Sequence, residues 1–218
     1  GLTDGVAFVD ISDPVNPVFV GKLLEHIPDP EHLAGAPQHM ESAWRDLKVY
    51  KNHVFVISEQ ETHGMQVFDL TRLRAVRTPQ TFKPDVTYDR INSAHNIVSN
   101  EETGFMYVVG GSGGGETCGG GHHAIDVREP KKPKFAGCFG DPRTGISGTG
   151  YSHDAQCVMY RGPDQKYVGR EICIGSNETI PSLRNGYDVS RKPERFRQRC
   201  SSCVRPAHPR LWQRFRER

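Results

Sequence analysis

The chain has 218 residues, 35% of them hydrophobic and 25% charged, with 23 Gly and 15 Pro; this composition is typical of a globular, turn-rich protein and excludes a disordered one. Its net charge of +2 is the sum of −6 over residues 1–178 (17 Lys and Arg against 23 Asp and Glu) and +8 over residues 179–218 (11 against 3). Residues 1–178 carry no basic face interleaved with aromatics, which argues against a nucleic-acid partner, and no apolar run reaches the roughly 18 residues of a transmembrane segment.

A strand followed by a tight turn occurs three times along the chain. The strands end at Asp10, Asp69 and Asp126, which lie 59 and 57 residues apart. Each aspartate is followed by turn residues and then by a second strand. In the middle copy we expect that strand at 79–82, after a small insertion. Recurrence at a nearly fixed spacing predicts repeated structural units.

A second hairpin fills the gaps between these units. Its copies turn at residues 51–52, 100–104 and 162–164. The two hairpins alternate, which gives four short strands per repeat and no helix pattern. We therefore expect an all-β fold, a partial β-propeller of four-stranded antiparallel blades. A β-sandwich also has short strands and Gly/Pro turns, but it does not need the same hairpin at a fixed period.

The expected strands amount to about three blades' worth within residues 1–178, whereas closed propellers typically have about 4–8 blades. The chain also opens inside a strand pattern. We therefore expect a fragment of a longer protein, whose signal peptide and anchor lie outside this sequence.

The last 40 residues, 179–218, depart from the repeat, because strand alternation stops and ten arginines appear. One interpretation is a basic interaction arm in which Cys200, Cys203 and His208 hold a metal. The other is an irregular, out-of-pattern tail that does not fold. The abrupt break inside a repeat favours the second interpretation.

Four cysteines are placed symmetrically about two predicted turns. The midpoint of Cys118 and Cys138 is residue 128, and the midpoint of Cys157 and Cys173 is residue 165. Residues placed in this way face each other across a hairpin, so we expect the disulfides Cys118–Cys138 and Cys157–Cys173. Disulfides imply an oxidising compartment and thus an extracellular or cell-surface location. Four reduced thiols in a cytosolic core are the alternative.

Polar pairs open the innermost strand of each predicted blade. The pairs occupy equivalent positions, 50 and 58 residues apart: Arg45 and Asp46, His95 and Asn96, and His153 and Asp154. Innermost strands line the central channel of a propeller, so these residues form a candidate binding site at the channel mouth. Such a ring suits an anion, a small polar ligand or a metal. The structural alternative is that the side chains hydrogen-bond backbone groups and tie the blades together.

Within this ring, His95 and His153 are the candidate metal ligands. Arg45 argues against a simple cation site, because a guanidinium stays charged, and it suits an anion better. Three further residues could reach the same face: Glu59, His63 and Glu178.

The tandem pair His122 and His123 lies within a predicted strand. Adjacent strand residues point to opposite faces, so these two side chains cannot both ligate one ion. The sequence contains no phosphate-binding loop and no nucleophile elbow, identifies no catalytic residue and requires no cofactor.

Four segments resemble one known family: 44–50 (WRDLKVY), 64–70 (GMQVFDL), 93–98 (SAHNIV) and 153–157 (HDAQC). Together they resemble the choice-of-anchor B family, whose members carry LVIVD-type repeats. The resemblance covers residues 1–178 and does not extend to the tail. It implies a secreted or surface-anchored β-propeller with no assigned activity.

Two functions are therefore expected. The first is a non-enzymatic module that binds a protein or a glycan outside the cell. The alternative is a metal-dependent enzyme that uses a histidine-containing ring at the channel mouth, and the feature that separates them is whether His95 and His153 converge as metal ligands. Two ligating histidines place their nitrogens roughly 3–3.5 Å apart. We expect His95 and His153 to converge without that spacing, which ranks a hydrogen-bonded ring first, a binding site second and a metal centre third.

Overall fold

The computed structural model describes residues 1–2, 4–25, 44–141 and 149–176. Within these ranges the protein is all-β, as predicted, and its helical segments are the two short 3-10 turns η2 (Leu70–Ala75) and η3 (Cys118–Gly120). No helix in the described ranges is long and apolar enough to cross a membrane. The predicted tail, with Cys200, Cys203 and His208, lies outside the described residues, as does Glu178.

Two four-stranded antiparallel sheets have the same topology. The first contains β3 (Arg45–Tyr50), β4 (His53–Ser58), β5 (Met65–Asp69) and β7 (Val86–Tyr88), in that order. The second contains β9 (Asn96–Asn100), β10 (Phe105–Val109), β12 (His122–Asp126) and β13 (Lys134–Phe139), again in that order. We call them the β3–β7 sheet and the β9–β13 sheet.

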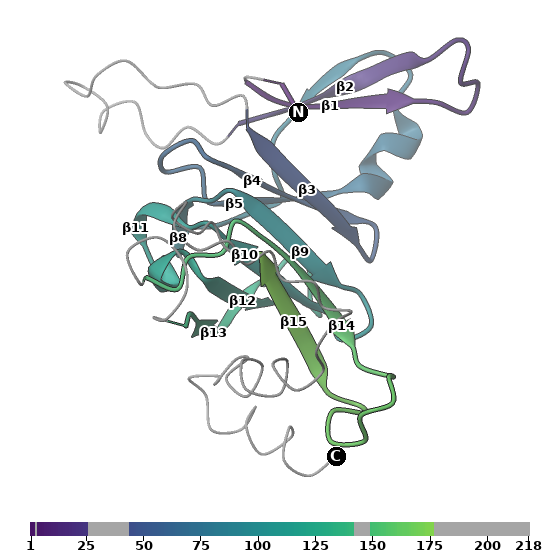
Figure 1. Cartoon of the computed structure of the whole chain (residues 1–218). Coiled ribbons are helices and arrows are strands. Elements are labelled where there is room, and N and C mark those ends of the chain that lie inside the picture. Colours follow the sequence, from purple (N-terminus) through teal and green to yellow (C-terminus); the bar gives the residue numbers. More distant parts are fainter. Residues whose placement is uncertain (3, 26–43, 142–148, 177–218) are drawn as a thin grey trace, which may run out of the picture.

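The remaining strands form smaller sheets. β1 (Gly5–Asp10) and β2 (Val18–Leu24) make an antiparallel hairpin, and β14 (Asp154–Met159) and β15 (Glu171–Ser176) make another. β8 (Ile91–Ser93) pairs with β11 (Ser112–Gly115). Figure 1 shows the sheets following one another through the molecule in chain order, from the β1–β2 hairpin to the β14–β15 hairpin.

The three repeated aspartates adopt the same local structure. Asp10, Asp69 and Asp126 each end a strand, and a carboxylate oxygen of each accepts a hydrogen bond from the backbone N–H two residues later, at 2.8, 3.0 and 3.0 Å. A side chain that binds its own backbone in this way fixes a turn. The repeat read from the sequence is therefore present as a repeated strand-and-turn unit.

The second strand of the middle unit differs from the prediction. β6 (Gln80–Phe82) does not pair with β5 but lies parallel to β2, with Gly21 opposite Gln80, and β7 takes the place beside β5. The physical reason is the side chain of Phe82, which is 5% exposed and packs 5.1 Å from the ring of Phe68 and 6.0 Å from that of Phe8. The insertion η2 gives the chain the length to reach this cluster.

Three apolar clusters join each sheet to the next. Val6, Phe8 and Leu23 of the first hairpin pack on Val54, Val56 and Phe68 of the β3–β7 sheet. Phe55, Ile57, Met65 and Val67 pack on Ile97, Met106, Val108 and Ile125 of the β9–β13 sheet. Val98, Tyr107 and Ala124 pack on Cys157 and Cys173 of the last hairpin.

Strand β4 illustrates why these sheets stack. Its apolar run Val54 to Ile57 is buried on both faces, with alternate side chains in two different clusters. A strand that is covered on both faces carries continuous rather than alternating hydrophobicity. The uninterrupted apolar run therefore places the β3–β7 sheet between two neighbours.

Both predicted disulfides are present. Cys157 and Cys173 are direct partners in the β14–β15 register, with their Cα atoms 4.0 Å apart, as the hairpin argument required. Cys118 and Cys138 are joined with their Cα atoms 5.3 Å apart, but by a different geometry. The register partner of Cys138 is His123, and Cys118 reaches it from the turn η3.

Candidate functional site

The predicted polar pairs all lie at the starts of β3, β9 and β14. β9 lies beside both β3 and β14, so the three pairs are neighbours in space although they are distant in sequence. Their side chains nevertheless divide into two groups with different surroundings: an aromatic row and a set of strand-linking groups.

The aromatic row consists of Trp44, His95 and His153. The rings of His95 and His153 lie 4.0 Å apart between centroids, with 47° between their planes. The indole of Trp44 stacks on His95 at 4.7 Å and is nearly parallel to it, at 4°. The indole N–H donates to the carbonyl oxygen of His95 at 2.7 Å, which fixes the stack, and Trp44 remains 47% exposed.

A carboxylate lies at the edge of this row. Glu59, which follows β4, accepts a hydrogen bond from His95 Nδ1. The other ring nitrogen of His95, Nε2, is buried and has no hydrogen-bond partner among the described residues. In the neutral ring, Nε2 therefore carries an unused lone pair. His63 does not join the row, because it is fully buried and its Nδ1 lies 3.0 Å from the carbonyl oxygen of Gly64.

Arg45 points away from the aromatic row. Its guanidinium lies 2.6 Å from a carboxylate oxygen of Glu25 and donates to the carbonyl oxygen of Leu2 at 2.9 Å. The side chains of Arg45 and Glu25 are 0% and 8% exposed, so this is a buried ion pair that holds the first hairpin against β3. The structure thus brings His95 and His153 together and leaves Arg45 apart from them.

Asp46 and Asn96 link adjacent strands. A carboxylate oxygen of Asp46 accepts from the backbone N–H of Ile97 at 3.0 Å, and the Asn96 amide donates to the carbonyl oxygen of His153 at 3.0 Å. A carboxylate oxygen of Asp154 accepts a hydrogen bond at 2.7 Å from the backbone N–H of the next residue. Asp46 accepts a second hydrogen bond of the same kind and length from the residue that follows it. These contacts match the structural alternative given for the polar pairs.

A second cluster, which the sequence did not single out, surrounds the Cys118–Cys138 disulfide. Cys118 Sγ lies 3.6 Å from His123 Nδ1, and that nitrogen lies 2.8 Å from the carbonyl oxygen of Glu116. Since a carbonyl only accepts, Nδ1 carries the proton and Nε2 accepts from the Tyr88 hydroxyl at 2.8 Å. Burial lowers the pKa of His123.

This cluster has the composition of a metal site. Within the part of the chain that the structure describes, Cys118, His123 and Cys138 are the three His, Cys, Asp or Glu side chains whose ligand atoms all lie within 4.8 Å of one another. No regular cysteine spacing marks it in the sequence, because the ligands come from a turn and two strands. His122 is not one of these three ligands; it is buried, its ring lies 6.0 Å from that of Phe139, and burial lowers its pKa to about 4.

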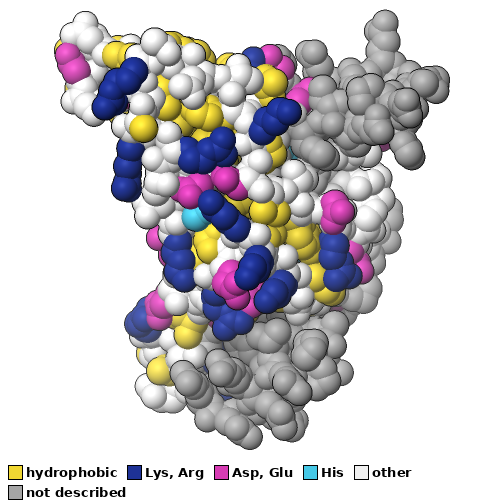
Figure 2. All heavy atoms as spheres, turned by 180° about the vertical axis from the view of Figure 1, so that it is seen from behind, with side chains coloured by type: hydrophobic (Ala, Val, Ile, Leu, Met, Phe, Trp, Pro, Cys, Tyr) yellow, Lys and Arg dark blue, Asp and Glu magenta, His cyan; other side chains and the backbone are white. Residues whose placement is uncertain are grey.

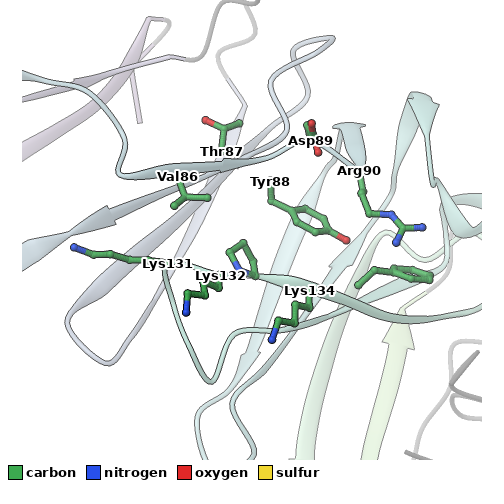
Figure 3. A pocket seen from close by; sticks show the side chains of 10 residues that line it. Val86, Thr87, Tyr88, Asp89, Arg90, Lys131, Lys132 and Lys134 are labelled. Atoms are coloured by element: carbon green, nitrogen blue, oxygen red, sulfur yellow. The ribbon is translucent and has the colours of Figure 1, made fainter. Parts of the chain in front are cut away.

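A groove of about 540 Å³ runs between residues 86–90 and residues 131–135 (Figure 3). Four cations line it, and three of them have partners: Lys131 lies 3.1 Å from Asp69, Lys132 lies 3.1 Å from Glu129, and Arg90 covers the ring of Phe135. Figure 2 shows basic and acidic side chains interspersed on one face of the molecule. The groove therefore offers no concentrated charge to a ligand.

Comparison with known proteins found no relative: no protein-family model, no curated protein and no solved structure matches the chain.

Proposed function

We propose that this chain belongs to a secreted or surface-anchored β-propeller repeat protein that acts as a non-enzymatic binding module. The fold part of the proposal is supported by two sheets of identical topology whose first strands lie side by side. The location is supported by two disulfides, which persist in oxidising compartments. The resemblance of residues 1–178 to the choice-of-anchor B family points the same way.

The observation that carries the binding function is the aromatic row. An indole that is 47% exposed and held flat by a stacked histidine is a rigid apolar platform, and it loses little side-chain entropy on binding. The half-exposed carboxylate of Glu59 lies at its edge as a strong hydrogen-bond acceptor. A flat apolar surface with an adjacent carboxylate matches a sugar ring, which has an apolar C–H face and hydroxyl donors. We therefore name a glycan as the ligand class.

Binding to a glycan array, followed by titration calorimetry with the best glycan, tests this proposal. Trp44→Ala is expected to weaken binding at least about tenfold, which corresponds to about 1.4 kcal/mol. Phe19→Ala is the matched control, since Phe19 is an aromatic residue that is 46% exposed on β2. A protein that binds no glycan, or that binds equally well with and without Trp44, would contradict the proposal.

The metal-dependent enzyme stays a second candidate because of one contact. Glu59 orients His95 through Nδ1, leaving Nε2 without a partner among the described residues, beside the ring of His153. Carboxylates commonly orient metal-binding histidines in this way. Stoichiometric metal in the purified protein, lost in both His95→Ala and His153→Ala, would favour the enzyme over the binding module.

A further inference from the structure

We propose that a metal site forms when the Cys118–Cys138 disulfide is reduced: the two thiolates and His123 then bind a zinc-class divalent ion. This proposal is independent of the binding function, because it uses a turn, β12 and β13 rather than the aromatic row. Its ligand set, two sulfurs and one imidazole, is the type that zinc selects.

The present geometry is close to what such an ion needs. With metal–sulfur bonds of about 2.3 Å and metal–nitrogen bonds of about 2.0–2.1 Å, neighbouring ligand atoms of a tetrahedral site lie roughly 3.5–3.8 Å apart. Cys118 Sγ and His123 Nδ1 already lie 3.6 Å apart. The two sulfurs are bonded to each other, so they must separate by roughly 1.7 Å after reduction.

The backbone around Cys118 can supply that movement. Cys118 lies in the three-residue turn η3, is followed by three glycines and is half-buried. Both Cys118 and Gly119 have left-handed backbone angles, with φ of 53° and 65°. By contrast, Cys157 and Cys173 lie within paired strands, are 2% and 6% exposed, and belong to no such three-ligand group among the described residues. The second disulfide is thus a natural control.

His123 has the partners that a ligating histidine needs. To bind through Nδ1, the ring moves its proton to Nε2 and donates it to the Tyr88 hydroxyl oxygen, which lies 2.8 Å away and can accept as readily as donate. A ligating imidazole whose other nitrogen is hydrogen-bonded is the usual arrangement in zinc sites. The carbonyl oxygen of Glu116, 2.8 Å from Nδ1, or a water completes four ligands.

The chemistry balances with a dithiol as reductant. The dithiol loses two electrons and two protons and becomes a disulfide, while Cys118–Cys138 accepts them and becomes two thiols. The metal then displaces the two thiol protons, and the tautomer change of His123 releases none. The turn at Cys118 is consequently tied to β13 by a covalent bond under oxidising conditions and by an ion under reducing ones.

Zinc binding by the reduced protein tests the proposal. The protein is reduced with a phosphine, freed of reductant without oxygen, and titrated with zinc against a chromophoric chelator; circular dichroism checks that it stays folded. We expect one zinc per chain in the reduced form and none in the oxidised form. Cobalt in place of zinc should give thiolate charge-transfer absorption.

Variants assign the site to these residues. Cys118→Ala/Cys138→Ala should abolish binding, and Tyr88→Phe, which keeps the buried ring, should weaken it about 10–100-fold. Cys157→Ala/Cys173→Ala and Cys200→Ser/Cys203→Ser should bind as the parent does. The proposal is overturned if the reduced, folded parent takes up no zinc, or if zinc binding survives loss of Cys118 and Cys138, which would assign it to other ligands.

Discussion

Replacing Cys157 and Cys173 with alanine measures how the β14–β15 hairpin is held. The disulfide closes a loop with a sequence separation of 16 residues. In the chain-entropy relation for cross-links, a loop of that length contributes about 3 kcal/mol at room temperature, because the unfolded chain loses that much conformational freedom. We therefore expect the double variant to lose at least about 3 kcal/mol of unfolding free energy.

The matched comparison is Cys118→Ala/Cys138→Ala, which opens a loop with a separation of 20 residues. The same relation gives loop-closure contributions that differ by only about 0.2 kcal/mol between the two loops. A larger difference in unfolding free energy between the two double variants therefore comes from packing. Cys157 and Cys173 belong to the apolar cluster beneath the β9–β13 sheet, whereas Cys118 and Cys138 are half-buried. The Cys157→Ala/Cys173→Ala variant should therefore be the less stable of the two.

Urea unfolding at neutral pH gives both differences, once mass spectrometry of non-reduced peptides has verified the pairing. A loss below about 1 kcal/mol in Cys157→Ala/Cys173→Ala would refute the reasoning, since it falls well under the loop-closure contribution. A larger loss of unfolding free energy in Cys118→Ala/Cys138→Ala than in Cys157→Ala/Cys173→Ala would refute the packing argument but not the loop-closure argument.

Three further predictions concern single residues. Asp46→Ala should cost about 1–3 kcal/mol in urea unfolding, because the N–H of Ile97 loses its acceptor; an unchanged midpoint would show that water replaces it. Burial raises the pKa of Glu171 in the folded state, so the free energy of unfolding should fall as pH rises from the ordinary glutamate pKa through the raised one. Glu171→Gln should remove that fall, and the same pH dependence of stability in variant and parent would contradict this. Gly21→Ala should lower the free energy of unfolding by about 1–3 kcal/mol, because a Cβ there would lie 2.2 Å from the carbonyl oxygen of Gln80. Hydrogen exchange of the backbone amides should become faster in β6 selectively.

Local signals in the sequence predicted the repeated units well. An aspartate that caps its own turn needs only the residue two positions later, so Asp10, Asp69 and Asp126 could be identified without knowledge of the sheets. The Cys157–Cys173 pairing was predictable for the same reason, since cross-strand register follows from the turn. The arrangement of these units as propeller blades stays a prediction.

Long-range choices were not predictable. β6 pairs with β2 because Phe82 packs in an aromatic cluster formed by two other elements. No local sequence pattern predicts this long-range contact. Arg45 was grouped with the histidines by repeat position, but Glu25, from another unit, holds it elsewhere. The contact of Cys118 with His123 depends on the shape of a glycine-rich turn, which spacing arguments do not capture.

The parallel pairing of β6 with β2 has a consequence for cooperativity. In an ordinary repeat array each unit contributes its own stability plus an interface with its neighbour, and units can be exchanged. β6 is covalently part of the second unit yet hydrogen-bonded into the sheet of the first. The β1–β2–β6 sheet therefore loses a strand when the second unit opens, and β6 loses its paired strand when the first hairpin opens. The first hairpin and the β3–β7 sheet are therefore expected to unfold as one block, with a shared opening free energy for the amides of β1, β2 and β6, and to be transferable to another protein only as a pair.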